Sequence, residues 1–158
     1  MSNAVIVRRA TLGDIPALVG LLGELFAIEA DFKPDSRLQH QGLCLMLEDM
    51  ASRRLLVAEI QDEVVGLCSL QVLVSTASGG LVGLVEDVVV KAAWRGRGIG
   101  ARLMQEIDGL ARELGLLRLQ LLADTGNAKA LDFYQRRGWV LTQLICLRRQ
   151  DDRFRASS

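Results

Sequence analysis

Residues 86–100 of the chain read Glu86-Asp87-Val88-Val89-Val90-Lys91-Ala92-Ala93-Trp94-Arg95-Gly96-Arg97-Gly98-Ile99-Gly100. Three consecutive valines are typical of a strand, and apolar residues then recur at helical spacing, at Ile99, Leu103, Ile107 and Leu110. The stretch therefore predicts a strand, a glycine-rich turn and a helix over residues 98–114. Glycines allow a tight turn and close approach of a ligand, and the first N–H groups of a helix have no partner within it. We expect this turn to bind an anion such as a pyrophosphate, helped by Arg95 and Arg97.

Two other interpretations of the turn stay open. Gly96-x-Gly98-x-x-Ala101 matches the dinucleotide-binding fingerprint, and Asp124 ends the next predicted strand, where a ribose-binding acid would stand. In that fingerprint the glycines follow the strand directly, whereas residues 91–94 separate them here. The second alternative is a tight turn without a ligand. Solvated arginines beside three glycines at a helix start argue against it, because they serve packing poorly.

The composition excludes several classes of protein. The chain has 158 residues, half of them apolar, with 19 basic and 19 acidic side chains. This length predicts a single domain over residues 1–150, followed by a polar tail at 151–158. Zero formal net charge argues against a nucleic-acid partner, because such proteins present a basic face. Membrane insertion and secretion are not expected, because no apolar run approaches the roughly 18 residues of a span and residues 1–5 do not open a secretion signal.

Cysteine and histidine usage adds two expectations. Cys44, Cys68 and Cys146 lie far apart, and His40 is the only histidine. A structural zinc site needs about four such ligands, so we expect no metal. Scattered thiols in an odd number fit a reducing compartment, and we therefore expect a cytoplasmic protein.

The rest of the chain predicts a mixed α/β sheet with helices on its faces. Periodicity and turn residues indicate strands at 5–9, 55–60, 64–75, 81–90 and 116–122, with one or two more at 139–147. They indicate helices from Ile15, at about 37–52, at 98–114, and from an Asn127 cap to about Arg137. Thr11-x-x-Asp14 is typical of a capping box before the first helix.

Two motifs in order resemble those of a known family. Arg95-x-x-Gly98-x-Gly100 is followed, after a helix and a strand, by Asn127-x-x-Ala130-x-x-Phe133-Tyr134-x-x-x-Gly138-Trp139. The pair is similar to the signatures of the GNAT family of N-acetyltransferases. The resemblance implies a mixed, mostly antiparallel central sheet that is splayed between two strands and flanked by about four helices. It also implies acetyl-CoA as cosubstrate.

The resemblance further implies how the coenzyme is held. Main-chain N–H groups of residues 97–100 would bind its pyrophosphate, and the backbones of Val88 and Val90 would pair with the pantetheine amides as an added strand does. The coenzyme-binding residues implied in this way are Val88, Val89, Val90, Arg95, Gly96, Arg97, Gly98, Ile99, Gly100, Asn127 and Tyr134.

Two residues are the candidates for the chemistry. Tyr134, the only tyrosine, falls on the position that the family uses as general acid for the departing sulfur; otherwise its ring would simply pack in the core. Glu86 is the candidate general base, because an ionisable residue within an apolar strand needs a task or a partner. Alternation places Glu86 on one face with Val88 and Val90, and Asp87, the reserve candidate, on the other. A partner for an arginine is the alternative role of Glu86.

These features predict an N-acetyltransferase that moves the acetyl group of acetyl-CoA directly to a primary amine of a small molecule or peptide. Glu29, Asp31, Asp35, Glu86 and Asp87 supply negative charge near the expected acceptor site, which favours a cationic amine. A non-catalytic acetyl-CoA sensor and a dinucleotide-binding oxidoreductase are the alternatives. The leucine-rich edge at 141–147 suggests pairing with a second copy, that is, a homodimer.

Overall fold

The computed structural model describes residues 4–151. They form two compact units, the first ending at Leu121 and the second beginning at Leu122. The first unit contains β1 (Ile6–Arg9), α1 (Ile15–Ile28), α2 (Ser36–Glu48), β2 (Arg53–Ile60), β3 (Glu63–Ser75), β4 (Gly80–Val90), α3 (Ile99–Glu113) and β5 (Leu119–Leu121), with short 3-10 turns at Leu12–Asp14 and Ala92–Trp94. The second contains α4 (Ala128–Gln135). The prediction of a single domain over 1–150 stays a prediction, and residues 152–158 of the expected tail lie outside the described residues.

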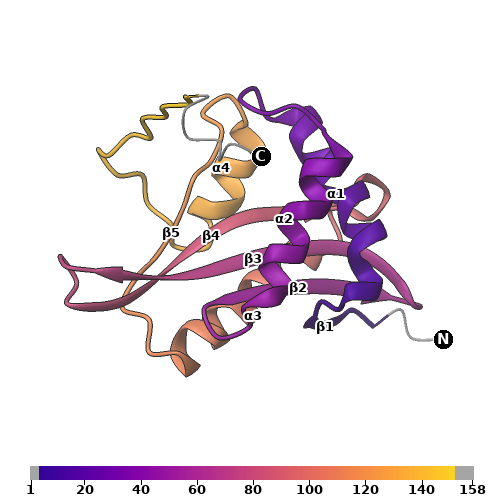
Figure 1. Cartoon of the computed structure of the whole chain (residues 1–158), viewed down its shortest axis with the longest axis horizontal. Coiled ribbons are helices and arrows are strands. Elements are labelled where there is room, and N and C mark those ends of the chain that lie inside the picture. The colour runs from indigo at the N-terminus through magenta and orange to yellow at the C-terminus, as the bar shows by residue number, and fades with distance from the viewer. Residues whose placement is uncertain (1–3, 152–158) are drawn as a thin grey trace. The chain divides into compact units, whose positions relative to one another are not determined.

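The strands form one sheet in the order β1-β2-β3-β4-β5 (Figure 1). The first four are antiparallel to their neighbours, and β5 is parallel to β4. The β4–β5 pairing covers only three pairs, from Gly83–Leu119 to Val85–Leu121, although β4 continues to Val90. The mixed, mostly antiparallel sheet and the four α-helices found among residues 4–151 confirm the expected fold class, and the early end of this pairing is the splay that the resemblance implied.

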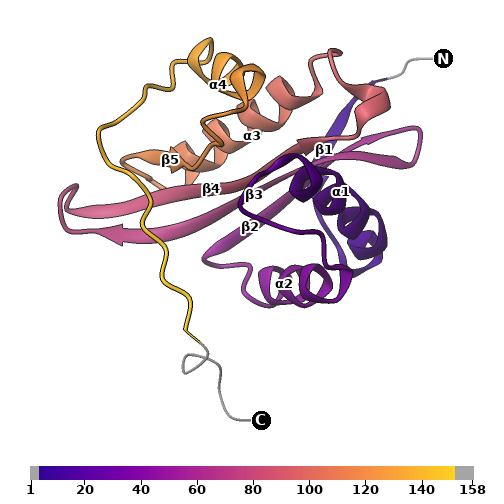
Figure 2. The ribbon, with the colours of Figure 1, turned by 90° about the horizontal axis from the view of Figure 1, so that it is seen from above.

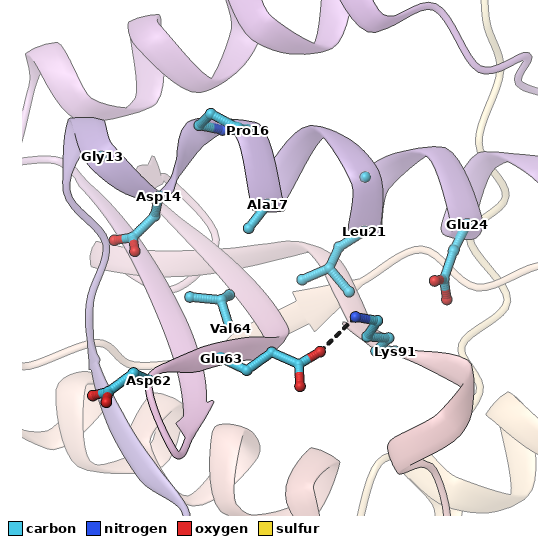
Figure 3. Close-up of a pocket in the computed structure, with 11 residues that line it drawn as sticks. Gly13, Asp14, Pro16, Ala17, Leu21, Glu24, Asp62, Glu63, Val64 and Lys91 are labelled. Carbon is cyan, nitrogen blue, oxygen red and sulfur yellow. Dashed lines mark hydrogen bonds and ion pairs between the residues drawn. The ribbon is translucent and has the colours of Figure 1, made fainter.

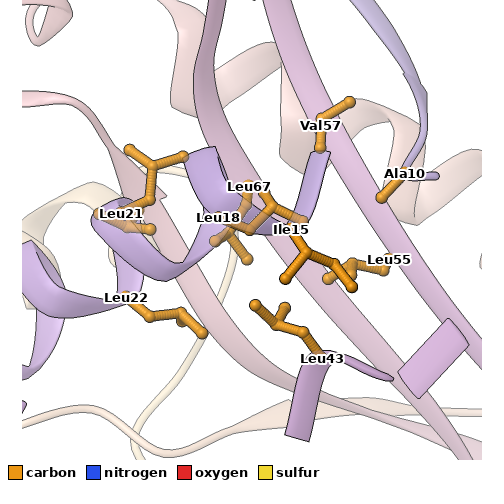
Figure 4. Packing of buried hydrophobic residues seen from close by; sticks show 10 residues of the cluster. Ala10, Ile15, Leu18, Leu21, Leu22, Leu43, Leu55, Val57 and Leu67 are labelled. Carbon is orange, nitrogen blue, oxygen red and sulfur yellow. The ribbon is translucent and has the colours of Figure 1, made fainter. Parts of the chain in front are cut away.

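Helices cover both faces of the sheet within the first unit. Figure 2 shows α1 and α2 on one face and α3 on the other. The α1/α2 face is closed by a cluster of buried apolar side chains that includes Ile15, Leu18, Leu43, Leu55 and Leu67 (Figure 4). On the other face, α3 buries the stripe predicted from its spacing, Ile99, Leu103 and Ile107. Two packed layers on a sheet fix the course of β4 and the start of α3, which carry the candidate site.

An ion-pair cluster ties the first strand to the first helix. Arg8 in β1 donates two hydrogen bonds of 2.9 Å to the Asp14 carboxylate and also pairs with Glu59 in β2. Asp14 accepts from the Thr11 main-chain N–H at 2.7 Å, which is the acidic half of the predicted capping box. The Arg8 guanidinium lowers the pKa of Asp14 to about 2. This cluster fixes where α1 begins.

The second unit is built around α4. The Asn127 side chain accepts a hydrogen bond from the Ala130 N–H at 3.1 Å, and Gly138 follows the helix with φ of +82°. The cap and the terminating glycine are both as predicted. The prediction of strands at 139–147 was wrong, because the structure has no strand between residues 139 and 151. An apolar run forms a strand only when another strand offers hydrogen bonds, and here Leu144 and Ile145 are 89% and 80% exposed.

Among residues 4–151, no helix is both long and apolar enough to cross a membrane.

Candidate active site

The outer edge of β4 is open beyond the point where β5 ends. Lys91 N–H donates to the Val65 carbonyl at 2.8 Å, so in this antiparallel pair the N–H and C=O of Val89 also point toward β3. The polar main-chain groups of Val88 and Val90 therefore point to the other side. The Val90 carbonyl accepts from Arg95 Nε at 2.9 Å. The remaining groups at this edge have no strand beside them in the first unit, so they are positioned to pair with an extended ligand.

The glycine-rich turn at the end of β4 presents main-chain donors. Gly96 and Gly98 have φ of +74° and +79°, a conformation that favours glycine, and Gly98 precedes the first residue of α3. The N–H groups of residues 97–100 have no acceptor among residues 4–151. Because α3 is 15 residues long, its dipole adds a partial positive charge at this end. The donors and the dipole together fit a bound diphosphate.

The two arginines of the turn are engaged with protein groups. Arg95 lies 3.6 Å from Glu24 of α1, and the same carboxylate accepts the Ala92 N–H at 3.1 Å. The Arg97 guanidinium lies 4.8 Å from the centre of the Trp94 ring. Arg95 thus holds the turn against α1 and the end of β4, and Arg97 stacks beside the donors. Their predicted contacts with phosphate stay predictions.

A β-bulge in β4 changes the predicted faces of the two carboxylates. Cys68 pairs with Val88 and Leu70 with Val85, so β4 has one extra residue opposite Ser69. Glu86 accepts from Gln71 Nε2 at 2.8 Å, and the Asp87 N–H donates to Ser69 Oγ at 3.0 Å. Ser69 and Gln71 are two residues apart on β3 and therefore share a face. The prediction that alternation separates Glu86 from Asp87 was wrong, because the extra residue brings both onto the α1/α2 face.

This face concentrates negative charge around Asp87. The Asp87 carboxyl is partly buried, and its pKa is raised to about 7 by burial first and then by the charges of Glu86 and Glu29. Glu29 follows the last residue of α1, so the three carboxylates come from two elements. A carboxyl with a pKa near neutrality accepts a proton from an ammonium group more readily than an ordinary aspartate does. The arrangement therefore suits a general base.

The two candidates from the second motif lie together on α4. The Tyr134 ring is partly buried and contacts the rings of Phe133 and Trp139 edge-on, with centroids 5.2 and 6.0 Å apart. Asn127 caps the same helix, as it would on any interpretation. Both residues belong to the second unit, whereas the β4 edge, the glycine turn and the carboxylates belong to the first. The roles of Tyr134 and Asn127 in the site stay predictions.

Sequence reasoning missed three residues that shape the site: Ser69, Gln71 and Glu24. The first two were detectable as polar residues in the otherwise apolar β3 run, which is the same signal that drew attention to Glu86. Glu24 carries no such signal, because a glutamate on a helix is ordinary and its contact with the turn spans 68 residues of sequence. Only the packing of α1 on the sheet reveals it.

A surface hollow lies beside the site, between α1 and the β2–β3 turn (Figure 3). Its lining includes Pro16, Ala17, Leu21 and Glu24, together with Lys91 and Glu63, which form an ion pair of 2.5 Å. None of residues 96–100 lines the hollow. Residues 4–151 contain no group of three or more His, Cys, Asp or Glu side chains that could hold a metal ion.

The strand, turn and helix that carry these donors also match a known family. The family model described as Acetyltransferase (GNAT) family matches residues 22–139, which is more than half of the chain. The chain therefore belongs to the GNAT acetyltransferase family.

Two relatives from Oryza sativa subsp. japonica are both named as glucosamine 6-phosphate N-acetyltransferases. Glucosamine 6-phosphate N-acetyltransferase 1 is 31% identical over 146 residues, which cover 85% of this chain and 80% of that protein. Probable glucosamine 6-phosphate N-acetyltransferase 2 is 44% identical over 62 residues, which cover 39% of this chain and 36% of that protein. The second match thus spans about a third of the relative's length.

A solved structure shares the fold. The aminoglycoside N-acetyltransferase AAC(6')-Iy in complex with CoA has a TM-score of 0.80 and 14% sequence identity, and the match covers 95% of this chain and 97% of that one. At this identity the likeness establishes the fold alone.

Proposed function

We propose that the protein is an N-acetyltransferase that moves the acetyl group from acetyl-CoA to a primary amine of a small molecule or peptide. The observation that carries the proposal is the run of main-chain donors at residues 97–100 that have no acceptor among residues 4–151. They stand in the turn that follows β4, whose outer edge is open at Val88 and at the Val90 N–H. A ligand that carries a diphosphate followed by a chain of amides would place the diphosphate at these donors and the amides along the open edge of β4. The N-acetyltransferase name of a relative and the CoA complex of a protein with the same fold both support acetyl-CoA as the acetyl donor.

The residues of this chain supply the proton transfers. Acetyl-CoA supplies an activated acetyl group as a thioester, which a neutral amine attacks and from which the thiol leaves. The Asp87 carboxylate takes the proton of the ammonium group, directly or through one water, because its pKa of about 7 matches that task. Asp87 was the reserve candidate; Glu86, the base expected from the sequence, lies beside it as the second carboxylate, and its own role as base stays a prediction. Tyr134 donates the proton to the leaving sulfur, as the family resemblance implies.

Direct transfer is favoured over an acetyl-cysteine intermediate. Cys68 is fully buried in β3, and burial raises the pKa of its thiol, with a smaller contribution from the charge of Asp87. A thiol in that environment is a poor nucleophile, because the reactive form is the thiolate. Cys44 lies on α2, with its Sγ 3.7 Å from His40 Nδ1, and not on the strand or turn that carries the candidate site.

We propose a cationic amine as the acceptor. The charges of Glu29 and Glu86 both act on Asp87, so an acceptor at this face meets three carboxylates. Charge complementarity then favours an amine with further positive charge over one that carries a phosphate. The relatives named for glucosamine 6-phosphate point the other way, which makes the comparison of the two acceptor classes informative.

The test is a panel of amines with acetyl-CoA, read by release of free thiol. We expect turnover with at least one amine, and a higher kcat/KM for an aminoglycoside than for glucosamine 6-phosphate. A preference for the phosphorylated sugar would overturn the cationic-acceptor proposal and leave the acetyl transfer intact. Absence of thiol release with every amine, despite binding of acetyl-CoA, would favour the sensor alternative.

The Tyr134→Phe variant distinguishes an enzyme from a non-catalytic sensor. The substitution removes only the hydroxyl and keeps the ring contacts with Phe133 and Trp139. Loss of a general acid typically lowers kcat by about 10²–10⁴-fold. We expect such a fall with an unchanged Kd for acetyl-CoA in calorimetry, whereas wild-type turnover in the variant would remove Tyr134 from the mechanism.

A further inference from the structure

The bulge in β4 leaves a main-chain donor that a buried side chain satisfies. The Asp87 N–H donates to Ser69 Oγ at 3.0 Å rather than to a carbonyl of β3. Ser69 is 2% exposed and lies opposite Leu55 of β2, so its hydroxyl is shielded from water. A hydroxyl in such a place costs free energy unless it is hydrogen-bonded, so its presence in β3 is explained by this contact.

The proton of the same hydroxyl has one acceptor in reach. Ser69 Oγ lies 3.5 Å from Oδ2 of Asp87, and this is its only acceptor contact among residues 4–151. The hydroxyl thus accepts from the main chain of Asp87 and faces the carboxyl of the same residue. Both contacts depend on the extra residue in β4, which turns Asp87 onto the face where Ser69 points.

We propose that Ser69 is the positioning residue of the candidate base: its buried hydroxyl fixes the bulge and holds the Asp87 carboxyl toward the acceptor face. This inference rests on the proposed function, because it assigns a base to acetyl transfer. Ser69 acts through Asp87 and touches no reacting atom itself.

The groups around Asp87 show how the Ser69 hydroxyl affects the protonation of the Asp87 carboxyl. Glu86 on its own strand and Glu29 at the end of α1 both favour the protonated carboxyl, as burial does. The Cys68 thiol on β3 also interacts with Asp87, and its own pKa is raised. Among these neighbours, the Ser69 hydroxyl alone stabilises the carboxylate, because a donor to the charged form favours that form.

The first measurement follows the Asp87 carboxyl directly. A carbon-13 NMR titration of aspartate-labelled protein, with Asp87→Asn to assign the signal, gives its midpoint without any turnover. In Ser69→Ala the midpoint should move to higher pH. Ser69→Cys keeps a similar volume with a weaker donor and should move it the same way, which covers the case that the alanine variant does not fold. Ser69→Thr retains the hydroxyl and should keep the wild-type midpoint.

The second measurement is the pH profile of kcat/KM. Loss of one hydrogen bond to a charged group should lower kcat/KM of Ser69→Ala about three- to tenfold below pH 7, with near-wild-type values at pH 9. Cys68→Ala is the matched control, because it truncates the preceding buried residue on the opposite face. The raised pKa of the Cys68 thiol keeps it uncharged in this pH range, so its loss should leave the low-pH side of the profile unchanged.

The outcomes separate the two proposals. An unmoved midpoint in Ser69→Ala or Ser69→Cys, a loss of activity that is equal at all pH values, or an equal shift in Cys68→Ala would each overturn the role of Ser69. If no amine is acetylated by the wild-type protein, the proposed function fails, and the NMR titration still decides whether Ser69 controls Asp87.

Discussion

At the scale of single residues, the most informative position is Asp87. Its pKa of about 7 lies above the ordinary value of 3.8, so the folded protein binds this proton more tightly than the unfolded chain does. The associated stability is fully present below about pH 4 and is lost as the pH rises toward 7. The fold therefore tolerates an unfavourable charge at neutral pH, which is typical of a residue kept for chemistry rather than for stability.

The variant Asp87→Asn tests how much the charged Asp87 carboxylate lowers the free energy of unfolding, because asparagine mimics the protonated carboxyl. At pH 8 the variant should be more stable than the wild type by on the order of 4 kcal/mol, since each pKa unit corresponds to about 1.4 kcal/mol, and at pH 4 the difference should be near zero. Urea unfolding at the two pH values measures it. Thiol release should fall at the same time. Asp108→Asn, at an exposed position on α3, is the control. A stability difference for Asp87→Asn that is the same at both pH values would contradict the assignment.

Some features of the site follow from a residue and its neighbours in sequence, and others do not. The glycine positions and the Asn127 cap were predictable because each follows from local rules of turns and caps, whereas the edge position of Val88 and Val90 was implied only by the family resemblance. The faces of Glu86 and Asp87 were not, because one extra residue in a strand reverses the alternation, and no residue type in Val85–Val88 signals a bulge. Ser69, which stabilises it, stands on another strand.

At the scale of elements, the start of α3 depends on glycine at position 98. An added Cβ at Gly98 meets open space, so the cost of Gly98→Ala comes from φ of +79° alone. That conformation costs an alanine roughly 1–2 kcal/mol. The turn should relax away from it and rotate the donors of residues 97–100.

We therefore expect Gly98→Ala to weaken acetyl-CoA binding by about tenfold or more, since 1.4 kcal/mol corresponds to a factor of 10. Calorimetry measures the Kd. Gly109→Ala, within α3, also meets open space but lies in the helix interior, and it should bind like the wild type. Equal affinity of both variants would show that the donors do not hold the coenzyme.

Elements were predictable where periodicity and end signals agree, as in α1, α3 and the β2–β3 hairpin. The C-terminal run 139–147 has strand-like composition, but composition fixes only what a segment prefers when a partner strand is available. β5 illustrates the same limit, since residues 116–122 were expected and only Leu119–Leu121 pair with β4.

At the scale of the whole molecule, acetyl-CoA should stabilise the fold by mass action. A ligand at 100 times its Kd that binds only the native state adds about 2.7 kcal/mol to the free energy of unfolding. For a domain of this length the melting temperature should rise by several degrees, roughly 2–4 °C per kcal/mol. Differential scanning fluorimetry with acetyl-CoA, CoA and a nicotinamide dinucleotide is the measurement. A rise with the dinucleotide alone would favour the oxidoreductase alternative.

Glu24 has a consequence for transplanting the glycine turn. Its carboxylate receives both the Ala92 N–H and the Arg95 side chain, so the signature that begins at Arg95 is anchored by a residue outside it. A protein engineer who grafts residues 95–100 onto a foreign scaffold would transfer the signature residues without Glu24, which anchors them. Such a chimaera needs an acidic group supplied by whatever helix the new host places beside the loop.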